Sequence, residues 1–99
     1  MSVFLVAKID IEDRQTYSRY EAGFMDIFTK FRGEMLSVDE SPAVLEGEWN
    51  CTRTVLIRFP DKAAADAWYY SDEYQALMQH RLSASKGKVV VLTGLDQLE

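Results

Sequence analysis

Cysteine, histidine and proline are almost missing from this sequence of 99 residues, which contains one cysteine, one histidine and two prolines. The lone cysteine, Cys51, cannot form an internal disulfide, which suits a reducing compartment. The lone histidine, His80, cannot make a metal site, because such a site needs three or four ligands and none has the required spacing. Glycine-rich phosphate loops and catalytic triads are also missing. These absences predict a protein without a metal or another cofactor.

Positive charge and long apolar runs are scarce as well. The formal net charge is -5 and the pI is about 4.8. An acidic chain repels phosphate groups, so nucleic acid and anionic membranes are not expected partners. No apolar stretch approaches the roughly 18 residues of a membrane span. The first apolar run, residues 2–8, is too short for a secretory leader and lacks a basic start. We therefore expect a cytoplasmic protein.

The residues that are present describe an ordinary folded domain. Hydrophobic residues make up 47% of the chain and charged residues 27%, which is typical of globular proteins. The length predicts a single domain over residues 1–99. Periodicity predicts strands over 3–10, 34–40, 54–59 and 88–95, a helix over 12–31, and two helices between 61 and 87. Asp13, Asp61 and Ser71 are the expected helix N-caps. We also expect residues 43–49 to resume the second strand after Ser41-Pro42, and Lys86-Gly87 to end the last helix.

The order of these elements, β-α-β-β-α-β, predicts an α+β fold of the ferredoxin-like type with an antiparallel sheet. Helices then cover one face of the sheet and leave the other bare. The first and last strands, however, are apolar on both faces, as in Val3-Phe4-Leu5-Val6 and Val89-Val90-Val91-Leu92. Monomeric proteins rarely expose such a patch. A homodimer formed through the bare sheet faces is the simplest way to cover it.

Five residues form the candidate ligand site: Glu46, Arg53, Trp68, Tyr74 and Arg81. In this topology the hairpin and the second helical region can border a cleft between helices and sheet. Trp68 and Tyr74 would be its apolar walls, and Arg53 or Arg81 would bind the carboxylate of a small acidic molecule. The competing interpretation is structural. The aromatic residues then belong to the core, and a Glu–Arg pair is a salt bridge that holds the helix.

His80 and Cys51 are the residues with the most reactive side chains. His80 is a possible general base, because the pKa of histidine lies near neutrality. Cys51 follows Asn50 in an expected turn, and Arg53 is the nearest cation that could favour its thiolate. For both residues a structural or incidental role is the simpler reading.

A set of motifs in the second half of the chain resembles a known family. They are Leu45-Glu46-Gly47-x-Trp49, then Arg53, Phe59-Pro60, Ala65-x-x-Trp68-Tyr69-x-Ser71-x-x-Tyr74-Gln75 and Arg81. Together they resemble the domain of unknown function 1330 family, small members of the dimeric α/β-barrel superfamily. The resemblance implies a ferredoxin-like fold and a homodimer, and it implies no agreed reaction. Arg58 stands where the family pattern has an acidic residue, and Arg32-Gly33-Glu34 where many relatives have two glycines.

Three functions are compatible with these features. The first is a homodimer that binds a small apolar or aromatic acid in the cleft. The second is a cofactor-free monooxygenase or isomerase, as in related dimeric barrels, where the substrate itself activates oxygen or shifts a proton. The third is a structural or regulatory dimer without a ligand. A deep pocket with a polar group at its floor would favour the first two, and a cleft filled by aromatic side chains would favour the third.

Overall fold

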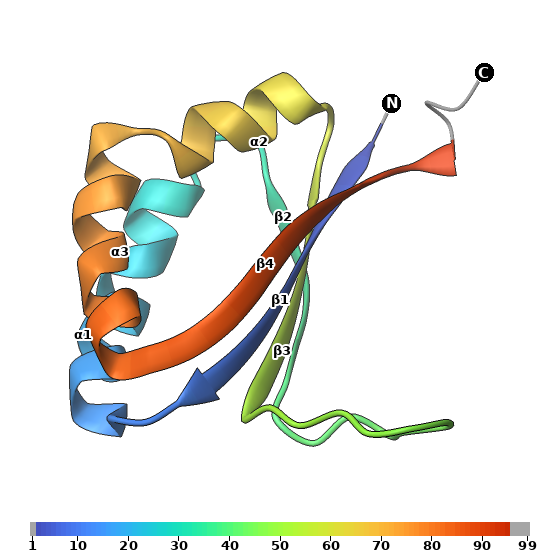
Figure 1. The fold of residues 1–99 in the computed structure, drawn as a ribbon. Coiled ribbons are helices and arrows are strands. Elements are labelled where there is room, and N and C mark those ends of the chain that lie inside the picture. The colour runs from blue at the N-terminus through green and yellow to red at the C-terminus, as the bar shows by residue number, and fades with distance from the viewer. Residues whose placement is uncertain (1, 96–99) are drawn as a thin grey trace.

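The computed structural model describes residues 2–95, in which one layer of helices packs on one face of an antiparallel sheet (Figure 1). The elements are β1 (Val3–Ile11), α1 (Arg14–Phe28), β2 (Glu34–Asp39), β3 (Arg53–Phe59), α2 (Lys62–Tyr69), α3 (Asp72–Ala84) and β4 (Ser85–Thr93). The strand order is β2-β3-β1-β4. This is the predicted ferredoxin-like arrangement, with the second helical region divided into α2 and α3.

β1 lies in the centre of the sheet and sets which residues face the helices. Val3, Leu5, Ala7 and Ile9 are all buried and share the helix-facing side. In the register, Leu5 is opposite Ile57 of β3 and Leu5 is also opposite Val91 of β4. Because side chains alternate along a strand, this register assigns every residue of β3 and β4 to one face or the other.

Each helix has the N-cap residue that the sequence predicts. Asp13 accepts a hydrogen bond from the backbone N–H of Thr16, with an N···O distance of 3.1 Å. This interaction and one from the Thr16 hydroxyl lower the pKa of Asp13. Asp61 and Ser71 accept equivalent bonds at the starts of α2 and α3. All three caps are therefore confirmed, and they satisfy N–H groups that have no partner inside a helix.

α1 packs against α3 at a glycine. The close neighbour of Gly23 in α1 is Leu77 of α3. A β-carbon on Gly23 would lie 2.7 Å from Leu77 Cδ1. The missing side chain thus brings two helices together, and the aromatic side of α1 turns toward the sheet.

Several boundaries differ from the prediction. α1 is shorter than the expected helix over 12–31. α3 ends at Ala84, and Lys86 and Gly87 already belong to β4. A β-carbon on Gly87 would lie 3.1 Å from the carbonyl oxygen of Lys8, so this glycine permits a close strand pairing and does not end a helix. Residues 43–49 form no strand. Gly47 turns the chain there with a φ of 78°, and β3 provides a partner strand only from Arg53 onward.

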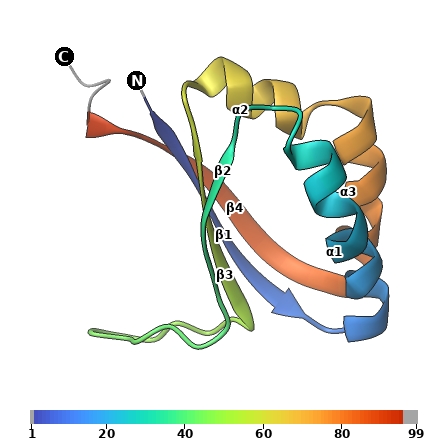
Figure 2. The same cartoon turned by 180° about the vertical axis from the view of Figure 1, so that it is seen from behind.

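The connection between β2 and β3, residues 40–52, is called the arm below. It projects away from the helices, beyond the bare side of the sheet, in both views (Figures 1 and 2). The arm exposes Val44 at 51% and Leu45 at 94%. Trp49 returns to the sheet, where its Nε1 donates to Thr54 Oγ1 at 2.8 Å and Lys8 Nζ lies 4.2 Å from the ring centre.

The sheet face opposite the helices has an apolar centre. The register brings five side chains together on this bare face: Phe4, Val6, Leu56, Val90 and Leu92. Val90 and Leu92 are each 52% exposed. Within residues 2–95, no helix is both long enough and apolar enough to cross a membrane.

Candidate functional site

A pocket of about 230 Å³ lies between the helices and the sheet. Strand residues such as Leu5 and Ile57 form one side, and aromatic residues of α1, α2 and α3 form the other. The charged side chains on its lining are Glu21, Arg53 and Arg81. An apolar pocket with a few fixed polar groups is the usual form of a small-molecule site.

The pocket has a closed end and an open end. At the closed end Tyr17, Trp68 and Tyr74 are each only 2% exposed. At the open end Met25 of α1 and Val38 of β2 are each 50% exposed. A ligand would therefore enter between α1 and the outer strand β2.

The joint between α2 and α3 positions the aromatic wall. Trp68 lies in the last turn of α2, and Ser71 Oγ donates to its carbonyl oxygen at 2.8 Å. The same Ser71 oxygen accepts from the backbone N–H of Tyr74 at 3.2 Å. Gln75 Nε2 then donates to the carbonyl oxygen of Tyr69 at 2.7 Å, which closes the joint from the other side. As a result the Trp68 and Tyr74 rings pack with their centres 4.2 Å apart.

Arg81 follows Tyr74 by about two turns of α3, so both project from the same face of the helix. It is only 5% exposed and lines the pocket. Its guanidinium carbon lies 5.8 Å from the centre of the Tyr20 ring. Burial opposes the charge of Arg81, whereas ionic charge on the neighbouring Tyr74 and Tyr20 oxygens would favour it, and together these effects raise the pKa of Arg81.

The charge of Arg81 has no ionic partner in the described part of the chain. Among the ion pairs of residues 2–95, none includes this guanidinium. A buried charge without a counter-ion is costly, and proteins normally pair it. Arg81 is therefore a buried cation at the wall of an apolar pocket, without a carboxylate partner among the described residues.

Tyr20 and Tyr74 share a buried hydrogen bond between their hydroxyl oxygens, 2.7 Å apart. Desolvation, followed by the nearness of Tyr74, raises the pKa of Tyr20 far above its ordinary value. Tyr20 therefore remains a neutral phenol and does not supply the counter-charge that Arg81 lacks.

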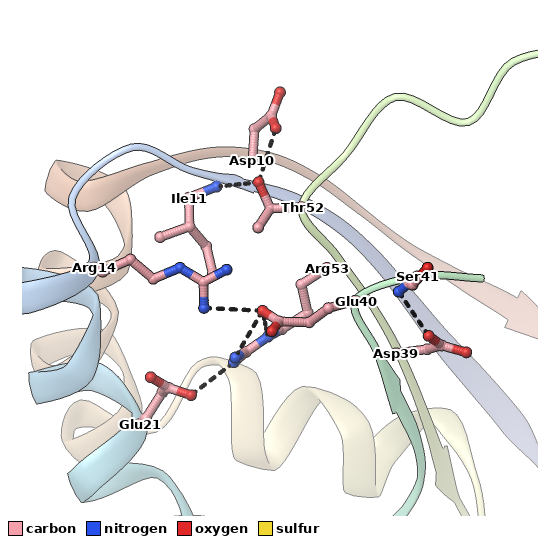
Figure 3. Close-up of polar contacts among 9 residues, drawn as sticks. All are labelled: Asp10, Ile11, Arg14, Glu21, Asp39, Glu40, Ser41, Thr52 and Arg53. Carbon is pink, nitrogen blue, oxygen red and sulfur yellow. Dashed lines mark hydrogen bonds and ion pairs between the residues drawn. The ribbon is translucent and has the colours of Figure 1, made fainter.

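Arg53 also lines the pocket, but its charge is already neutralised (Figure 3). Its Nη1 donates to Glu21 Oε2 at 2.8 Å, and its Nη2 donates to Glu40 Oε2 at 3.2 Å. Arg14 makes a second ion pair with Glu40 at 3.0 Å. Burial opposes the charge of Arg53, and the hydrogen bond and charge of Glu21 outweigh it, so the pKa of Arg53 is raised. The Arg53 network ties α1 to the start of the arm beside the pocket.

The far end of the arm is fixed nearby. The hydroxyl of Thr52 accepts from the backbone N–H of Ile11 at 3.2 Å and donates to Asp10 Oδ1 at 3.1 Å (Figure 3). At the near end, Asp39 Oδ1 accepts from the backbone N–H of Ser41 at 2.8 Å. Both ends of the arm are thus held against the sheet.

The structure brings four of the five predicted ligand-site residues to one pocket: Arg53, Trp68, Tyr74 and Arg81. Glu46 lies exposed on the arm and does not line the pocket. His80 is half-buried on α3, and Cys51 is half-buried with its Sγ 3.4 Å from Thr54 Oγ1; neither lines the pocket. Within residues 2–95 no group of three or more His, Cys, Asp or Glu side chains is placed to hold a metal ion.

Tyr20 is a site residue that the sequence did not single out, and it lies on the apolar stripe of α1. Its hydroxyl was the available clue, because a buried tyrosine usually needs a hydrogen-bond partner. Tyr17, on the same stripe, lies beneath the guanidinium of Arg53, whose carbon is 5.3 Å from the ring centre. The two tyrosines on the buried face of α1 thus lie beside the two arginines of the pocket.

Comparison with protein families decides the relationship of the chain. The family model described as "Domain of unknown function (DUF1330)" matches residues 2–95. The chain belongs to this family. A search of curated proteins finds no match.

Solved structures place this DUF1330 chain among ferredoxin-like proteins. A protein of unknown function from Rhodopseudomonas palustris, RPA0582, has a TM-score of 0.80 at 15% identity, over 95% of this chain and 82% of the other. A dimeric ferredoxin-like protein of unknown function from Jannaschia has a TM-score of 0.72 at 16% identity, over 95% and 100%. SnoaB, a cofactor-independent oxygenase from Streptomyces nogalater, has 0.68 at 11% identity, over 98% and 96% in its N63A form. At these identities the likeness establishes the fold alone.

Proposed function

We propose that this protein binds a small apolar or aromatic carboxylate in the pocket between helices and sheet, with the carboxylate on Arg81. The observation that carries the proposal is a buried guanidinium that lines an apolar pocket and has no carboxylate partner within residues 2–95. An anionic ligand supplies the missing charge, and an arginine binds a carboxylate through two parallel hydrogen bonds. Arg53 is the weaker candidate, because Glu21 and Glu40 already neutralise it.

The size and lining of the pocket set the kind of acid. About 230 Å³ is less than the roughly 300–1,000 Å³ of pockets for drug-sized molecules. The ligand is therefore small, with one ring or a short chain. The aromatic wall of Trp68 and Tyr74 favours a flat apolar body.

We further propose that the protein works as a homodimer joined through its bare sheet faces. The five-residue apolar centre of that face and the exposed Val44 and Leu45 of the arm support this. The ferredoxin-like protein from Jannaschia is described as dimeric, which adds support at the level of fold.

Cofactor-free oxygenation or isomerisation is the second candidate function. SnoaB, which shares the fold, is described as a cofactor-independent oxygenase. A closed apolar pocket with a cationic group also suits a substrate that becomes an anion during the reaction. Oxygen consumption, measured with an electrode on any acid found to bind, separates this function from binding alone. A purely structural dimer is the less favoured alternative, because it gives the unpaired Arg81 no purpose.

The test of the binding proposal uses two ligands of similar shape, 4-phenylbutanoate and its amide. The first is an anion and the second is neutral. Titration calorimetry should detect the acid and give at least about tenfold weaker binding for the amide, since hydrogen bonds to charged groups contribute roughly 1.5–3 kcal/mol. Arg81→Met should lose the acid. Arg19→Met, which removes an exposed arginine from α1, is the matched control and should bind normally. Equal binding by Arg81→Met and the parent would contradict the proposal.

A further inference from the structure

The closed end of the pocket contains more hydrogen-bond donors than acceptors. Arg81 offers up to five N–H groups and can accept none. The Tyr20 and Tyr74 hydroxyls are bonded to each other, and one bond uses one of their two hydrogens. Trp68 adds an indole N–H, which is donor only. The side-chain acceptors among these four residues are the two tyrosine oxygens, so several donors have no partner within the group.

Trp68 is the clearest case of an unused donor. Its Nε1 is buried and has no acceptor among residues 2–95. The rings around it belong to three phenylalanines and two tyrosines, Phe24, Phe28, Phe59, Tyr69 and Tyr74. Neither tyrosine hydroxyl accepts from the indole N–H. A buried donor without an acceptor costs about 1–3 kcal/mol. A buried polar group without a partner needs an explanation, and for a residue that lines a pocket a ligand provides one.

We infer that the ligand carries a second acceptor oxygen beside its carboxylate, and that the Trp68 N–H binds this oxygen. This inference rests on the proposed function of carboxylate binding. It names the ligand class as oxo acids with an apolar body. A ketone oxygen accepts two hydrogen bonds and brings no donor of its own, whereas a hydroxyl would add one more donor to a site that already has too many.

The position of Tyr74 explains why one carboxylate does not bind both Arg81 and the Trp68 N–H. Its ring packs on Trp68 with the centres 4.2 Å apart, while its hydroxyl meets Tyr20 and interacts with Arg81. Trp68 and Arg81 are therefore separated along the length of one tyrosine side chain. A carboxylate seated on Arg81 leaves Trp68 for an oxygen elsewhere on the same ligand.

The test compares acids that differ only in one oxygen. The first pair is 4-phenylbutanoate and 4-oxo-4-phenylbutanoate, and the second is phenylacetate and phenylglyoxylate. All four are ionised at pH 7, so charge is constant. Calorimetry on the intact protein should show an oxo acid binding about tenfold more tightly than its partner in at least one pair, the effect of one good buried hydrogen bond. Trp68→Phe keeps a ring and removes the N–H, and should reduce this preference to within about threefold.

A spectroscopic measurement covers the case in which Trp68→Phe folds poorly. The sequence has two tryptophans, so the ¹⁵N-labelled parent gives two indole N–H signals, and Trp49→Phe assigns them. The preferred oxo acid should move the Trp68 signal downfield, as a new hydrogen bond does, and its partner acid should not.

The outcomes separate the two proposals. An oxo preference that depends on the Trp68 N–H supports the inference. Acids that bind through Arg81 with no preference in either pair, and without a downfield shift of the Trp68 signal, overturn the inference and leave the proposed function intact. Failure of all four acids to bind would overturn both.

Discussion

Replacing Arg81 by methionine should make the ligand-free protein more stable, although it removes a residue that fits closely into the fold. Methionine has a similar length and fills irregular apolar space. The change removes a buried cation that has no carboxylate partner within residues 2–95. Most substitutions of buried residues destabilise a protein, so a gain in stability would be a specific sign of a charge kept for binding.

The expected size follows from the contacts of Arg81. Burying one ion costs several kcal/mol. Against this stand its interaction with the neutral Tyr74 hydroxyl, about 1.5–3 kcal/mol for a hydrogen bond to a charged group, and its contact with the Tyr20 ring, about 0.5–2 kcal/mol. These contacts sum to about 2–5 kcal/mol, so a burial cost above that sum leaves a net gain on replacement, for which we expect about 1–2 kcal/mol. For a domain of this size that raises Tm by roughly 4–16 °C.

Thermal unfolding measured at one fixed protein concentration checks this, because dimer formation would make Tm depend on concentration. Arg19→Met is again the control and should change stability by less than about 0.5 kcal/mol. Destabilisation of Arg81→Met by more than about 1 kcal/mol would refute the reasoning. It would show that the tyrosine contacts of Arg81 hold α3 in place and that the residue is structural.

Three further predictions concern assembly, packing and pH. The parent should scatter light as a particle of about twice 11.4 kDa at micromolar concentration, and Val90→Lys should give a monomer, since Val90 lies on the bare face; a Val90→Lys dimer would place the interface elsewhere. Trp68→Ala should cost about 3–5 kcal/mol in denaturant unfolding, as expected for a buried tryptophan, and a loss below about 1 kcal/mol would mean that the core does not need its ring. Hydrogen bonds from the Thr16 hydroxyl and from the Thr16 backbone N–H lower the pKa of Asp13, so the contribution of its charge to stability exists above the ordinary pKa of the carboxyl and is lost as pH falls through the lower value. Asp13→Asn should flatten that part of the acid unfolding curve, and an unchanged curve would show that these bonds do not stabilise the charged carboxylate.

Local chemistry made much of the fold predictable. Asp13, Asp61 and Ser71 cap the helices because a short polar side chain at this position can accept a hydrogen bond from a free backbone N–H of the first turn. The side chains of β1 alternate between the two faces of the sheet, so the sequence also predicts which residues share a face. The arm could not be predicted, because residues 43–49 look extended and lack only a partner strand, which is a property of the register and not of the segment. Gly87 was ambiguous for a similar reason, since a helix end and a close strand pairing both favour glycine.

The candidate site was predictable in its composition and not in its electrostatics. Tyr74 and Arg81 share a helix face by spacing alone, and the structure confirms that both line one pocket. The sequence gives no means of telling Arg53 from Arg81. Only the three-dimensional arrangement shows that Glu21 and Glu40 surround Arg53 and that none of the described carboxylates reaches Arg81. The placement of Glu46 likewise depends on the direction of the arm.

β4 carries a further consequence for how this protein behaves in solution. Among the described residues it is an outermost strand, and its nine residues pair with β1 alone. Its Val89-Val90-Val91-Leu92 segment has no charge and no proline, which is the composition that recruits strands from other molecules into fibrils. At one end of the strand, the charges of Lys86 and Lys88 disfavour pairing with a strand of another molecule. The other end of the strand lacks such charges. Under conditions that keep the protein monomeric, slow aggregation would therefore begin at β4 before the fold itself is lost.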